Sequence, residues 1–394
     1  MTILWVNPSF LDYRVSLYRE LNLLSNNNFF IVYSKNRVPL RVQKKIEFHL
    51  GKNALGLEGE KSILLGEKND TANTHLRLPY QPKLWNTIKK IKADIVITEG
   101  FFQWTPFSLL KKYFSNIPIL LAYERTKHTE RNCPKWREAY RKIITKFIDG
   151  YIVNGTLTKE YLLSFGIPEN KIFTGGMSAD SEGLYNKVKQ LSFDEISFFR
   201  NKFKITETPI FLYIGQFIER KGVIELINNW KIYKNNNGKG TLICVGDGKL
   251  FEKCKNLIVS EKISEIFLTG AIDYDEIYKF YAIADVFIIA TLEDNWSLVV
   301  PEAMACGLPI ACSKYNGCSP DLIFEGHNGK VFDPLNTVEF LDTLFYFSNN
   351  FDILKKLGYN SIEIEKKFNT INVANNIYNA CKAIISKNEH TPTP

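Results

Sequence analysis

The sequence predicts an α/β protein with two doubly wound parallel-sheet domains, and three observations indicate this class. The chain has 394 residues, more than the roughly 100 to 200 of one typical domain. Short runs rich in β-branched and aromatic residues alternate with helix-like segments throughout. Hydrophobic residues make up 45% of the chain and charged residues 23%, which is ordinary for a globular protein and excludes a disordered one.

The strand-like runs divide evenly between the two halves of the chain, and this alternation is typical of parallel sheets with helical crossovers. The front runs are TILWV, FFIVY, DIVIT, PILLAY and GYIV, and the back runs are PIFLYIG, TLICVG, EIFLTG, DVFIIA and LPIACS. We expect one domain at 1–180, a second at 190–365, and a C-terminal helix at 366–388 that crosses back to the first. Segment 175–190, which contains Gly and Ser and lacks a strand pattern, is predicted to be a linker.

Several function classes are excluded by composition. No run approaches the ~20 apolar residues of a membrane span, and the first residues lack the pattern of a secretory signal, so we expect a cytoplasmic protein. The seven cysteines are scattered without a CxxC pair, which favours buried thiols over a zinc site or a disulfide framework.

Charge is unevenly distributed along the chain. Basic residues exceed acidic ones by 12 in residues 1–190, whereas acidic residues exceed basic ones by 4 in residues 191–394. A basic front half favours an anionic partner there, such as a lipid headgroup or a phosphorylated substrate, although a solvated basic surface is the alternative. Nucleic acid is disfavoured because no recognisable binding module is present.

Candidate chemistry lies in loops that directly follow strand-like runs, where open parallel sheets bind ligands. Asp294 and Glu302 follow DVFIIA, and Ser297 between them is expected to cap a helix whose start attracts a phosphate. Two acids beside a phosphate site are suited to paired hydrogen bonds from vicinal hydroxyls; solvated acids are the alternative. Lys221, with Arg220 beside it, follows PIFLYIG at a second helix start, where an ammonium can meet a diphosphate.

These segments carry a resemblance to a known family. FLYIGQFIERKGVIELI, VGDG and the stretch 267–335 resemble, in order, the donor-binding domain of the retaining GT-B glycosyltransferases whose signature is E-x7-E. The front half resembles the acceptor domain of that family more loosely, through NPSFLDYRVSLYREL, DIVITEG and YIVNGTLTKEYLLSFGIPENKIF. The resemblance implies a GT-B fold, with two Rossmann-like domains facing a central cleft, and a hexosyltransferase-type enzyme that needs neither metal nor cofactor.

The resemblance also implies roles for residues of the back half. Glu302 would bind the ribose, Asp294 the transferred sugar, and Lys221 the diphosphate. Asp at 294 is one methylene shorter than the usual Glu, and Gln216 stands where many members have Arg, so Lys221 and Arg220 would carry more of the diphosphate charge. Other donor contacts are expected at Gly215, Gly270, Asn295, Trp296, Ser297 and Leu298.

One pair of acids has a metal-binding spacing but is not expected to hold a metal. Asp273-x-Asp275 has the DxD spacing that belongs to another glycosyltransferase fold. Asp273 and Glu276 also have the spacing of a capping box for the next helix, so no metal site is expected.

Candidate groups of the front half lie in three loops. By the resemblance, the loop ERTKHTER after PILLAY supplies a polar group at the reacting centre, and Glu124 and His128 are the candidates; a solvated His128 is the alternative. The aromatic rings after DIVIT are suited to stacking on a sugar or a polyprenyl chain, with buried packing as the alternative. The positions expected to contact the acceptor are Tyr13, Arg14, Phe102, Trp104, Arg125 and Arg131.

The segment KWREAYRKIITKF has apolar residues at helical spacing, with basic residues around them. We expect the apolar face to pack on the sheet and the basic face to suit anionic lipid. The members of the apolar face are Trp136, Tyr140, Ile143, Ile144 and Phe147.

Together these features predict a retaining glycosyltransferase. The donor would be a UDP or GDP sugar, and the acceptor a saccharide or a polyprenyl-linked saccharide. The expected setting is assembly of capsule, O-antigen of lipopolysaccharide or exopolysaccharide, with the enzyme cytoplasmic or peripheral on the inner face of a bacterial plasma membrane. Two alternatives stay open: a GT-B-fold sugar-nucleotide epimerase and a non-catalytic sugar-nucleotide-binding subunit.

Overall fold

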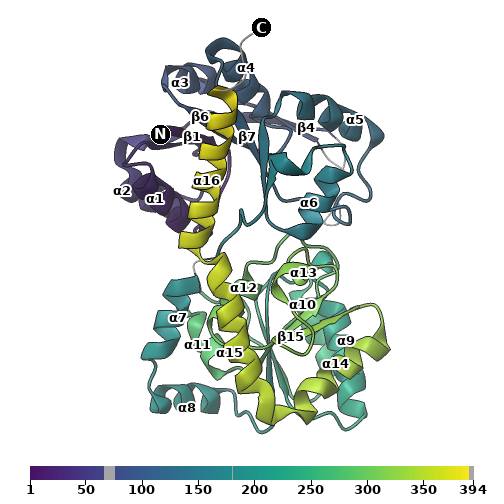
Figure 1. Ribbon diagram of the computed structural model, residues 1–394. Helices are drawn as coiled ribbons and strands as arrows, with labels where there is room; N and C mark the ends of the chain where they lie inside the picture. The colour runs from purple at the N-terminus through teal and green to yellow at the C-terminus, as the bar shows by residue number, and fades with distance from the viewer. Residues whose placement is uncertain (66–75, 180, 390–394) are drawn as a thin grey trace. The chain divides into compact units, whose positions relative to one another are not determined.

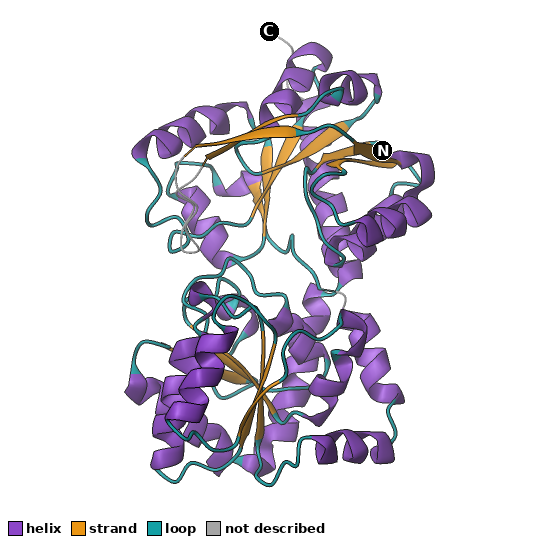
Figure 2. Ribbon diagram, turned by 180° about the vertical axis from the view of Figure 1, so that it is seen from behind, coloured by secondary structure: helices purple, strands orange, loops and turns teal. Residues whose placement is uncertain are grey.

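The computed structural model describes residues 1–65, 76–179 and 181–389 (Figure 1). The chain divides into two compact units: an N-terminal unit of Met1–Ser178 with Thr370–Pro394, and a C-terminal unit of Ala179–Asn369. In each unit helices cover a parallel sheet (Figure 2). The predicted fold class, two doubly wound parallel-sheet domains, is therefore confirmed.

The N-terminal unit is built on a seven-stranded parallel sheet with the order β3-β2-β1-β6-β7-β8-β9. Residues of β1 alternate between two cores: Ile3 and Trp5 face one, and Leu4 and Val6 face the other. The strands are β1 (Ile3–Val6), β2 (Phe29–Ser34), β3 (Ala54–Leu57), β6 (Ile95–Glu99), β7 (Ile119–Tyr123), β8 (Gly150–Val153) and β9 (Ile172–Phe173).

Helices cover both faces of this sheet. Side chains of α1, α2 and α16 belong to the core on one face, and those of α3, α5 and α6 to the core on the other. An antiparallel hairpin, β4 (Lys61–Leu65) with β5 (Leu76–Tyr80), is separate from the sheet. The helices are α1 (Tyr13–Leu24), α2 (Leu40–Leu50), α3 (Leu84–Lys90), α4 (Thr105–Ser115), α5 (Lys135–Ile144), α6 (Thr156–Leu163) and α16 (Thr370–Glu389), with 3-10 turns η1 (Gly51–Asn53), η2 (Thr145–Phe147) and η3 (Glu169–Lys171).

The C-terminal unit has a six-stranded parallel sheet with the order β12-β11-β10-β13-β14-β15. Because the order reverses direction between β10 and β13, the crevice at their carboxyl ends is where ligands of such sheets bind. The strands are β10 (Ile210–Ile214), β11 (Thr241–Val245), β12 (Ile266–Leu268), β13 (Val286–Ile289), β14 (Ile310–Ser313) and β15 (Gly329–Phe332).

Helices and short 3-10 turns connect these strands, and aromatic side chains such as Phe211, Tyr213 and Trp230 fill the core beneath α9 and α14. The helices are α7 (Ser181–Gln190), α8 (Phe193–Lys202), α9 (Val223–Asn235), α10 (Phe251–Ser260), α11 (Tyr278–Ile283), α12 (Val299–Ala305), α13 (Ser319–Leu322), α14 (Thr337–Asn349) and α15 (Leu354–Glu365), with η4 (Glu219–Lys221), η5 (Tyr274–Glu276), η6 (Phe351–Ile353) and η7 (Lys366–Phe368).

The interpretation of α5 is wrong in its orientation. Ile144 is buried as predicted, but Trp136, Ile143 and Phe147, which were assigned to the sheet-facing side, are 51%, 56% and 53% exposed. The buried face instead carries two arginines, at 137 and 141, each 4% exposed. The hydrophobic pattern misleads here because two charged residues occupy the inward positions.

Two further local predictions are corrected. Segment 175–190 is not a plain linker, because α7 occupies 181–190, buries Ser181 and Leu184, and contacts α11 and α12. Asp273 and Glu276 do not form the predicted capping box: Asp273 precedes η5 without a side-chain cap, and the Glu276 carboxylate pairs with Lys279.

The last described helix, α16, closes the core of the N-terminal unit against α1 and β8. None of the helices in the described part of the chain combines the length and the apolar character needed to cross a bilayer.

Candidate functional site

The loops that follow β10 and β13 are joined at the switch point of the C-terminal sheet. The carbonyl oxygen of Arg220 accepts hydrogen bonds from Leu292 N at 2.8 Å, Glu293 N at 3.1 Å and Thr291 Oγ1 at 2.8 Å. One carbonyl therefore fixes the loop after β13 against the turn η4, which carries the predicted diphosphate residues.

Gly222 makes this close approach possible. Its φ is +64°, and a Cβ atom placed there would lie 1.8 Å from the carbonyl oxygen of Ala290. Only glycine fits both the left-handed conformation and the contact. The turn places Lys221 two residues before Val223, the first residue of α9, where the backbone N–H groups of the helix start have no internal partner.

Lys221 and Asp294, 73 residues apart in the sequence, form an ion pair between Nζ and Oδ2. Their side chains are 15% and 11% exposed. Asp294 Oδ2 also accepts a hydrogen bond from Ser297 Oγ at 2.5 Å, and Oδ1 accepts one from Trp296 N at 3.3 Å. Burial acts to raise the pKa of Asp294, but Lys221 and Ser297 outweigh it, so that the pKa is lowered and the carboxylate stays ionised.

The predicted cap at Ser297 is wrong. Helix α12 begins at Val299 with Leu298 at the N-cap position, and no side chain caps it. The hydroxyl of Ser297 orients Asp294 instead, while the backbone N–H of Ser297 donates to Asn316 Oδ1 at 3.3 Å. The loop thus uses its polar groups to hold the acid rather than to start the helix.

Glu302 is 7% exposed and its two carboxylate oxygens accept from two tyrosines. Tyr281 OH donates to Oε2 at 2.9 Å and Tyr274 OH to Oε1 at 3.3 Å. Burial raises the pKa of Tyr281 well above its usual range, and the negative charge of Glu302 raises it further. The phenol therefore keeps its proton and remains a hydrogen-bond donor. Neither tyrosine could be predicted from the sequence, because neither stands at a spacing that points to Glu302.

The other predicted donor positions belong to the ends of neighbouring strands. Gly215 N donates to the Val245 carbonyl at 3.0 Å, and Gly246 N to the Gly270 carbonyl at 3.0 Å. Trp296 is 6% exposed, and its ring lies 6.0 Å from that of Phe368. The two backbone hydrogen bonds, from Gly215 and from Gly246, align the backbone at the carboxyl ends of β10, β11 and β12. Three more predicted positions, Gln216, Asn295 and Leu298, lie in the two loops.

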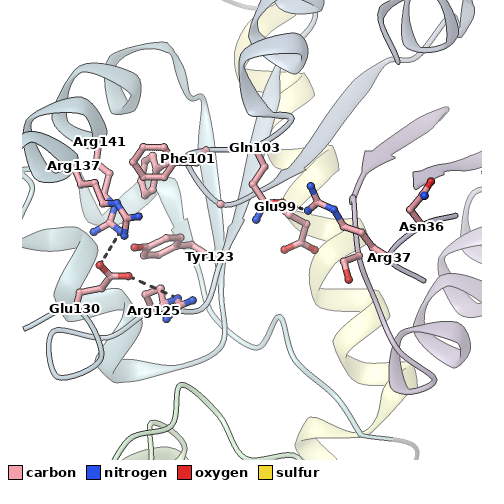
Figure 3. A pocket seen from close by; sticks show the side chains of 13 residues that line it. Asn36, Arg37, Glu99, Phe101, Gln103, Tyr123, Arg125, Glu130, Arg137 and Arg141 are labelled. Atoms are coloured by element: carbon pink, nitrogen blue, oxygen red, sulfur yellow. Dashed lines mark hydrogen bonds and ion pairs between the residues drawn. The ribbon is translucent and has the colours of Figure 1, made fainter. Parts of the chain in front are cut away.

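The N-terminal unit contains a cavity of about 460 Å³ at the carboxyl ends of its strands (Figure 3). Of the predicted acceptor contacts, Phe102 and Arg125 line it. Trp104 does not line the cavity. Its side chain is 1% exposed and packs in the core, which agrees with the alternative of buried packing given for these aromatic rings.

Arg14 and Glu99 form a buried pair at the start of α1 and the end of β6. Their closest approach is 3.7 Å, and Glu99 Oε1 also accepts from Trp5 Nε1 and Asn7 Nδ2, each at 3.1 Å. Burial raises the pKa of Glu99, Arg14 opposes this, and the nearby Glu124 reinforces it. Tyr13 is the first residue of α1, and its ring lies 5.7 Å from the guanidinium of Arg14.

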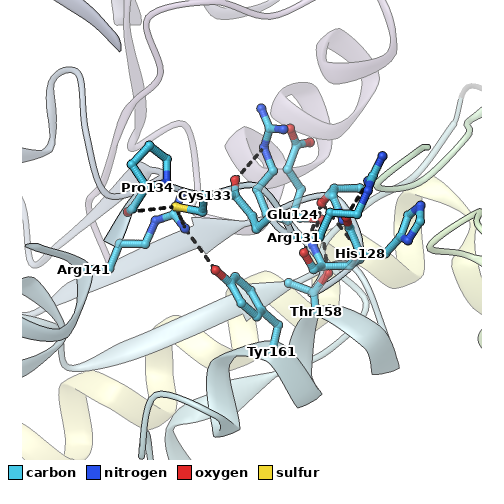
Figure 4. Close-up of polar contacts among 12 residues, drawn as sticks. Glu124, His128, Arg131, Cys133, Pro134, Arg141, Thr158 and Tyr161 are labelled. Carbon is cyan, nitrogen blue, oxygen red and sulfur yellow. Dashed lines mark hydrogen bonds and ion pairs between the residues drawn. The ribbon is translucent and has the colours of Figure 1, made fainter. Parts of the chain in front are cut away.

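His128 and Arg131 do not line the cavity. Arg131 Nη1 donates to the carbonyl of its own loop at His128, at 2.6 Å. In Figure 4 the imidazole of His128 lies on the opposite side of this loop from the contacts of Arg141. The carbonyl of Glu124 is held by Thr158 Oγ1 at 3.2 Å, while its side chain is exposed.

Other residues that line the cavity were missed as site candidates. Arg137 and Arg141 point inward from α5, and their spacing of four residues on one helix face was the available signal. Glu130 binds Arg141, with Oε2 accepting from Nη2 at 2.8 Å. Tyr123 lines the cavity from the end of β7.

Comparison with known proteins agrees with this fold. Residues 195–363 match the family Glycosyl transferases group 1. An uncharacterized glycosyltransferase, MJ1178, of Methanocaldococcus jannaschii is 29% identical over 157 residues, which cover 40% of this chain and 43% of the relative. The chain spans about half or less of the length of the first curated relatives that it matches.

Solved structures match over nearly the whole chain. HepE of Anabaena, in complex with UDP and glucose, has a TM-score of 0.75 at 14% identity, with 97% of this chain and 100% of HepE covered. The lipopolysaccharide outer core galactosyltransferase WaaB, in its apo form, has a TM-score of 0.68 at 16% identity, with 97% and 99% covered. At these identities the likeness shows the fold, which is that of the GT-B glycosyltransferases.

Proposed function

Because residues 195–363 match the family Glycosyl transferases group 1 and the chain has the GT-B fold, we propose that the protein is a hexosyltransferase that uses a nucleotide-diphosphate sugar. The transfer retains configuration and needs no metal. The proposal rests above all on the Lys221–Asp294 pair, which joins the loops that follow the neighbouring strands β10 and β13. The match to HepE, whose structure holds UDP and glucose, favours a UDP sugar over a GDP sugar as the donor.

Lys221 and the start of α9 provide the positive charge for the departing diphosphate. An ammonium has three N–H groups, and among the described residues Lys221 makes one hydrogen bond, to Asp294. It can therefore stabilise the negative charge that develops on the leaving group while Asp294 remains its partner.

Asp294 is suited to orient the transferred sugar. Ser297 Oγ and Trp296 N fix its carboxylate, so the acid is preorganised and remains ionised. Glu302, held by Tyr274 and Tyr281, would accept hydrogen bonds from the ribose hydroxyls, because carboxylate oxygens have more than one lone pair each.

The N-terminal unit would bind the acceptor, a saccharide or polyprenyl-linked saccharide of capsule, O-antigen or exopolysaccharide assembly. Phe102 and Arg125 line its cavity, and Tyr13 and Arg14 lie at the start of α1. Glu124 and His128 are the candidates for the group that faces the reacting centre. The match to the galactosyltransferase WaaB supports a surface polysaccharide as the setting.

The exposed face of α5 supports peripheral binding to the inner face of the membrane. Aromatic and aliphatic side chains that are half exposed, next to lysines, are suited to an anionic lipid surface. We expect co-sedimentation with vesicles that contain phosphatidylglycerol but not with pure phosphatidylcholine, and loss of it in Trp136→Ala/Phe147→Ala. The face consists of Lys135, Trp136, Lys142 and Ile143 of α5 and of Lys146 and Phe147 of the adjoining turn η2.

The test of the proposed function is a thermal-shift panel of UDP and GDP sugars, followed by an assay of nucleotide release. A donor at 100 times its Kd should stabilise the protein by about 2.7 kcal/mol. Lys221→Met should remove this shift and the release. The matched control is Lys231→Met, on α9, where the lysine side chain is 34% exposed and pairs with Glu261 at 2.6 Å.

The outcomes separate the alternatives. Binding that survives Lys221→Met would contradict the proposed donor site. Binding without release in the presence of acceptor would favour a non-catalytic subunit, and an altered donor sugar without acceptor would favour an epimerase.

A further inference from the structure

The cavity of the N-terminal unit has two chemically different ends, which Figure 3 shows on either side of Glu99. Arg37 and Asn36 lie at one end. Arg125, Glu130, Arg137 and Arg141 lie at the other, with Tyr123 and Phe101 beside them. We call this second set, without Phe101, the arginine end.

Charges at the first end are balanced by buried partners. Arg37 forms an ion pair with Glu60, whose side chain is 1% exposed, and its Nη1 donates to Gln103 Oε1 at 2.5 Å. Glu99, which lies between the two ends, is paired with Arg14 at 3.7 Å. This end therefore has no excess charge that calls for a ligand ion.

The arginine end has three arginines for one carboxylate, a formal charge of +2. Glu130 is 3% exposed at its side chain and serves two of them: Oε2 lies 2.8 Å from Arg141 Nη2, and Oε1 lies 3.7 Å from Arg125 Nε. Arg137 is 4% exposed, and burial lowers its pKa, because removal from water disfavours the charged form. Arg137 and Arg141 are buried, whereas the Arg125 side chain is 29% exposed, so an anion that joins them would offset part of the cost of removing this charge from water.

Hydrogen-bond donors are also in place for such an anion. The hydroxyl of Tyr123 and the Nε of Arg141 are buried and have no hydrogen-bond partner among the described residues. In Figure 3 the Tyr123 hydroxyl points toward the group formed by Glu130, Arg137 and Arg141. A buried polar group without a partner costs free energy, so a ligand oxygen that accepts from it gains that amount on binding.

We propose that the arginine end binds an anionic group of the acceptor, a phosphate or a carboxylate, through Arg125, Arg137 and the Tyr123 hydroxyl. Planar guanidinium groups match both oxyanions with paired hydrogen bonds. The proposal rests on the proposed function, because it treats this cavity as the acceptor site. It narrows the acceptor from saccharides in general to those that carry a negative charge.

The experiment measures the affinity of the full-length protein for glucose 6-phosphate, glucuronate and glucose by titration calorimetry. We expect at least one of the two anions to bind at least ten-fold more tightly than glucose. Preference for the phosphate indicates a phosphorylated acceptor, and preference for the carboxylate a uronic acid. Arg125→Gln should reduce the preference about ten-fold, as expected for the loss of a charge-assisted hydrogen bond.

Tyr123→Phe is the decisive variant, because it removes only a hydroxyl that lacks a hydrogen-bond partner in the described part of the chain. Its melting temperature should equal or exceed that of the unmodified protein, while its affinity for the preferred anion falls several-fold. The matched charge control is Arg19→Gln, an arginine of α1 whose side chain is 49% exposed and which pairs with Glu20. It should keep the full preference.

Equal affinity for glucose and the anions, no binding of either anion, or an unchanged preference in Arg125→Gln and Tyr123→Phe would overturn the inference. These failures are distinct from failure of the proposed function. The latter is read from donor binding and its loss in Lys221→Met, which involves the C-terminal unit alone.

Discussion

The Lys221–Asp294 contact, which we propose to bind the donor, also bears on the stability of the fold. Both side chains are more than four-fifths buried, so removal of either partner leaves the other charge in a poorly solvated place. Breaking a buried pair is more harmful than replacing it.

Lys221→Met should therefore lower the free energy of unfolding by about 3 kcal/mol. The double variant Lys221→Met/Asp294→Asn should recover most of that loss, because no buried charge remains. Urea denaturation of the two variants, with Lys231→Met as the surface control, measures the difference. Equal stability of the single and double variants would mean that the Asp294 charge is well solvated.

The lowered pKa of Asp294 makes stability depend on pH. The folded-state pKa lies below the unfolded value of about 3.9, so this acid contributes stability above pH 4, and the contribution is lost as the pH falls through the folded pKa. In a series of urea titrations, the stability difference between the unmodified protein and Asp294→Asn should be constant near neutrality and shrink below pH 4. A difference that grows toward acid pH would reverse the sign of the shift.

Single residues of the site differ in how far the sequence could predict them. Lys221 and Asp294 could be singled out because each follows a strand-like run, and the two strands are neighbours in the sheet. Tyr274 and Tyr281 could not, because their link to Glu302 arises only when η5 and α11 pack beside α12. The arginines of α5 were visible as charges, but their burial depends on Glu130, which comes from a separate loop.

At the scale of elements, the turn η4 depends on a glycine that does more than adopt a positive φ. Gly222 and Gly326 have nearly the same φ, +64° and +68°. A Cβ at 222 would clash with a backbone oxygen, whereas nothing lies within 4 Å of one at 326.

The pair allows conformational strain to be separated from steric overlap. Gly326→Ala should cost about 1 to 2 kcal/mol, the price of a left-handed alanine. Gly222→Ala should cost about 3 to 4 kcal/mol, because the overlap adds to the same strain. It should also weaken donor binding, since the displaced turn carries Lys221. Chemical denaturation measures both losses of stability. Equal losses in Gly222→Ala and Gly326→Ala would show that the loop after β13 can move to accommodate the added methyl group.

Strands were more predictable than helix faces. All ten strand-like runs are strands in the structure, because parallel strands buried on both faces are continuous apolar segments. The strands that were not predicted, such as β3 (ALGL), β9 (IF) and β15 (GKVF), are short or contain glycine. The buried face of α5 was predicted wrongly because the hydrophobic pattern shows the orientation of a helix only when its buried face is apolar.

At the scale of the whole molecule, the N-terminal unit is discontinuous in sequence. Helix α16 supplies six side chains to its core, all at most 3% exposed, from a segment that follows the entire C-terminal unit. These are Val373, Ala374, Ile377, Ala380, Cys381 and Ile384.

Ile377→Ala should lower the stability of the N-terminal unit by about 3 kcal/mol, because it leaves a cavity in this core. Ile371→Ala, on the same helix but 50% exposed, should change it by less than about 0.5 kcal/mol. Hydrogen exchange should show faster opening of β1 and β8 in Ile377→Ala, with β10 and β13 unchanged. Uniform acceleration in both sheets would indicate that the units unfold together.

Residues 1–178 leave the ribosome long before the helix that completes their core. The 191 residues of the C-terminal unit are synthesised in between, which takes about ten seconds or more at roughly 5 to 20 residues per second. During that interval the apolar side chains of α1 and β8 that pack against α16 are not yet covered. The nascent protein should therefore be a client of chaperones that shield exposed apolar surface, even though its second half can fold as soon as it emerges.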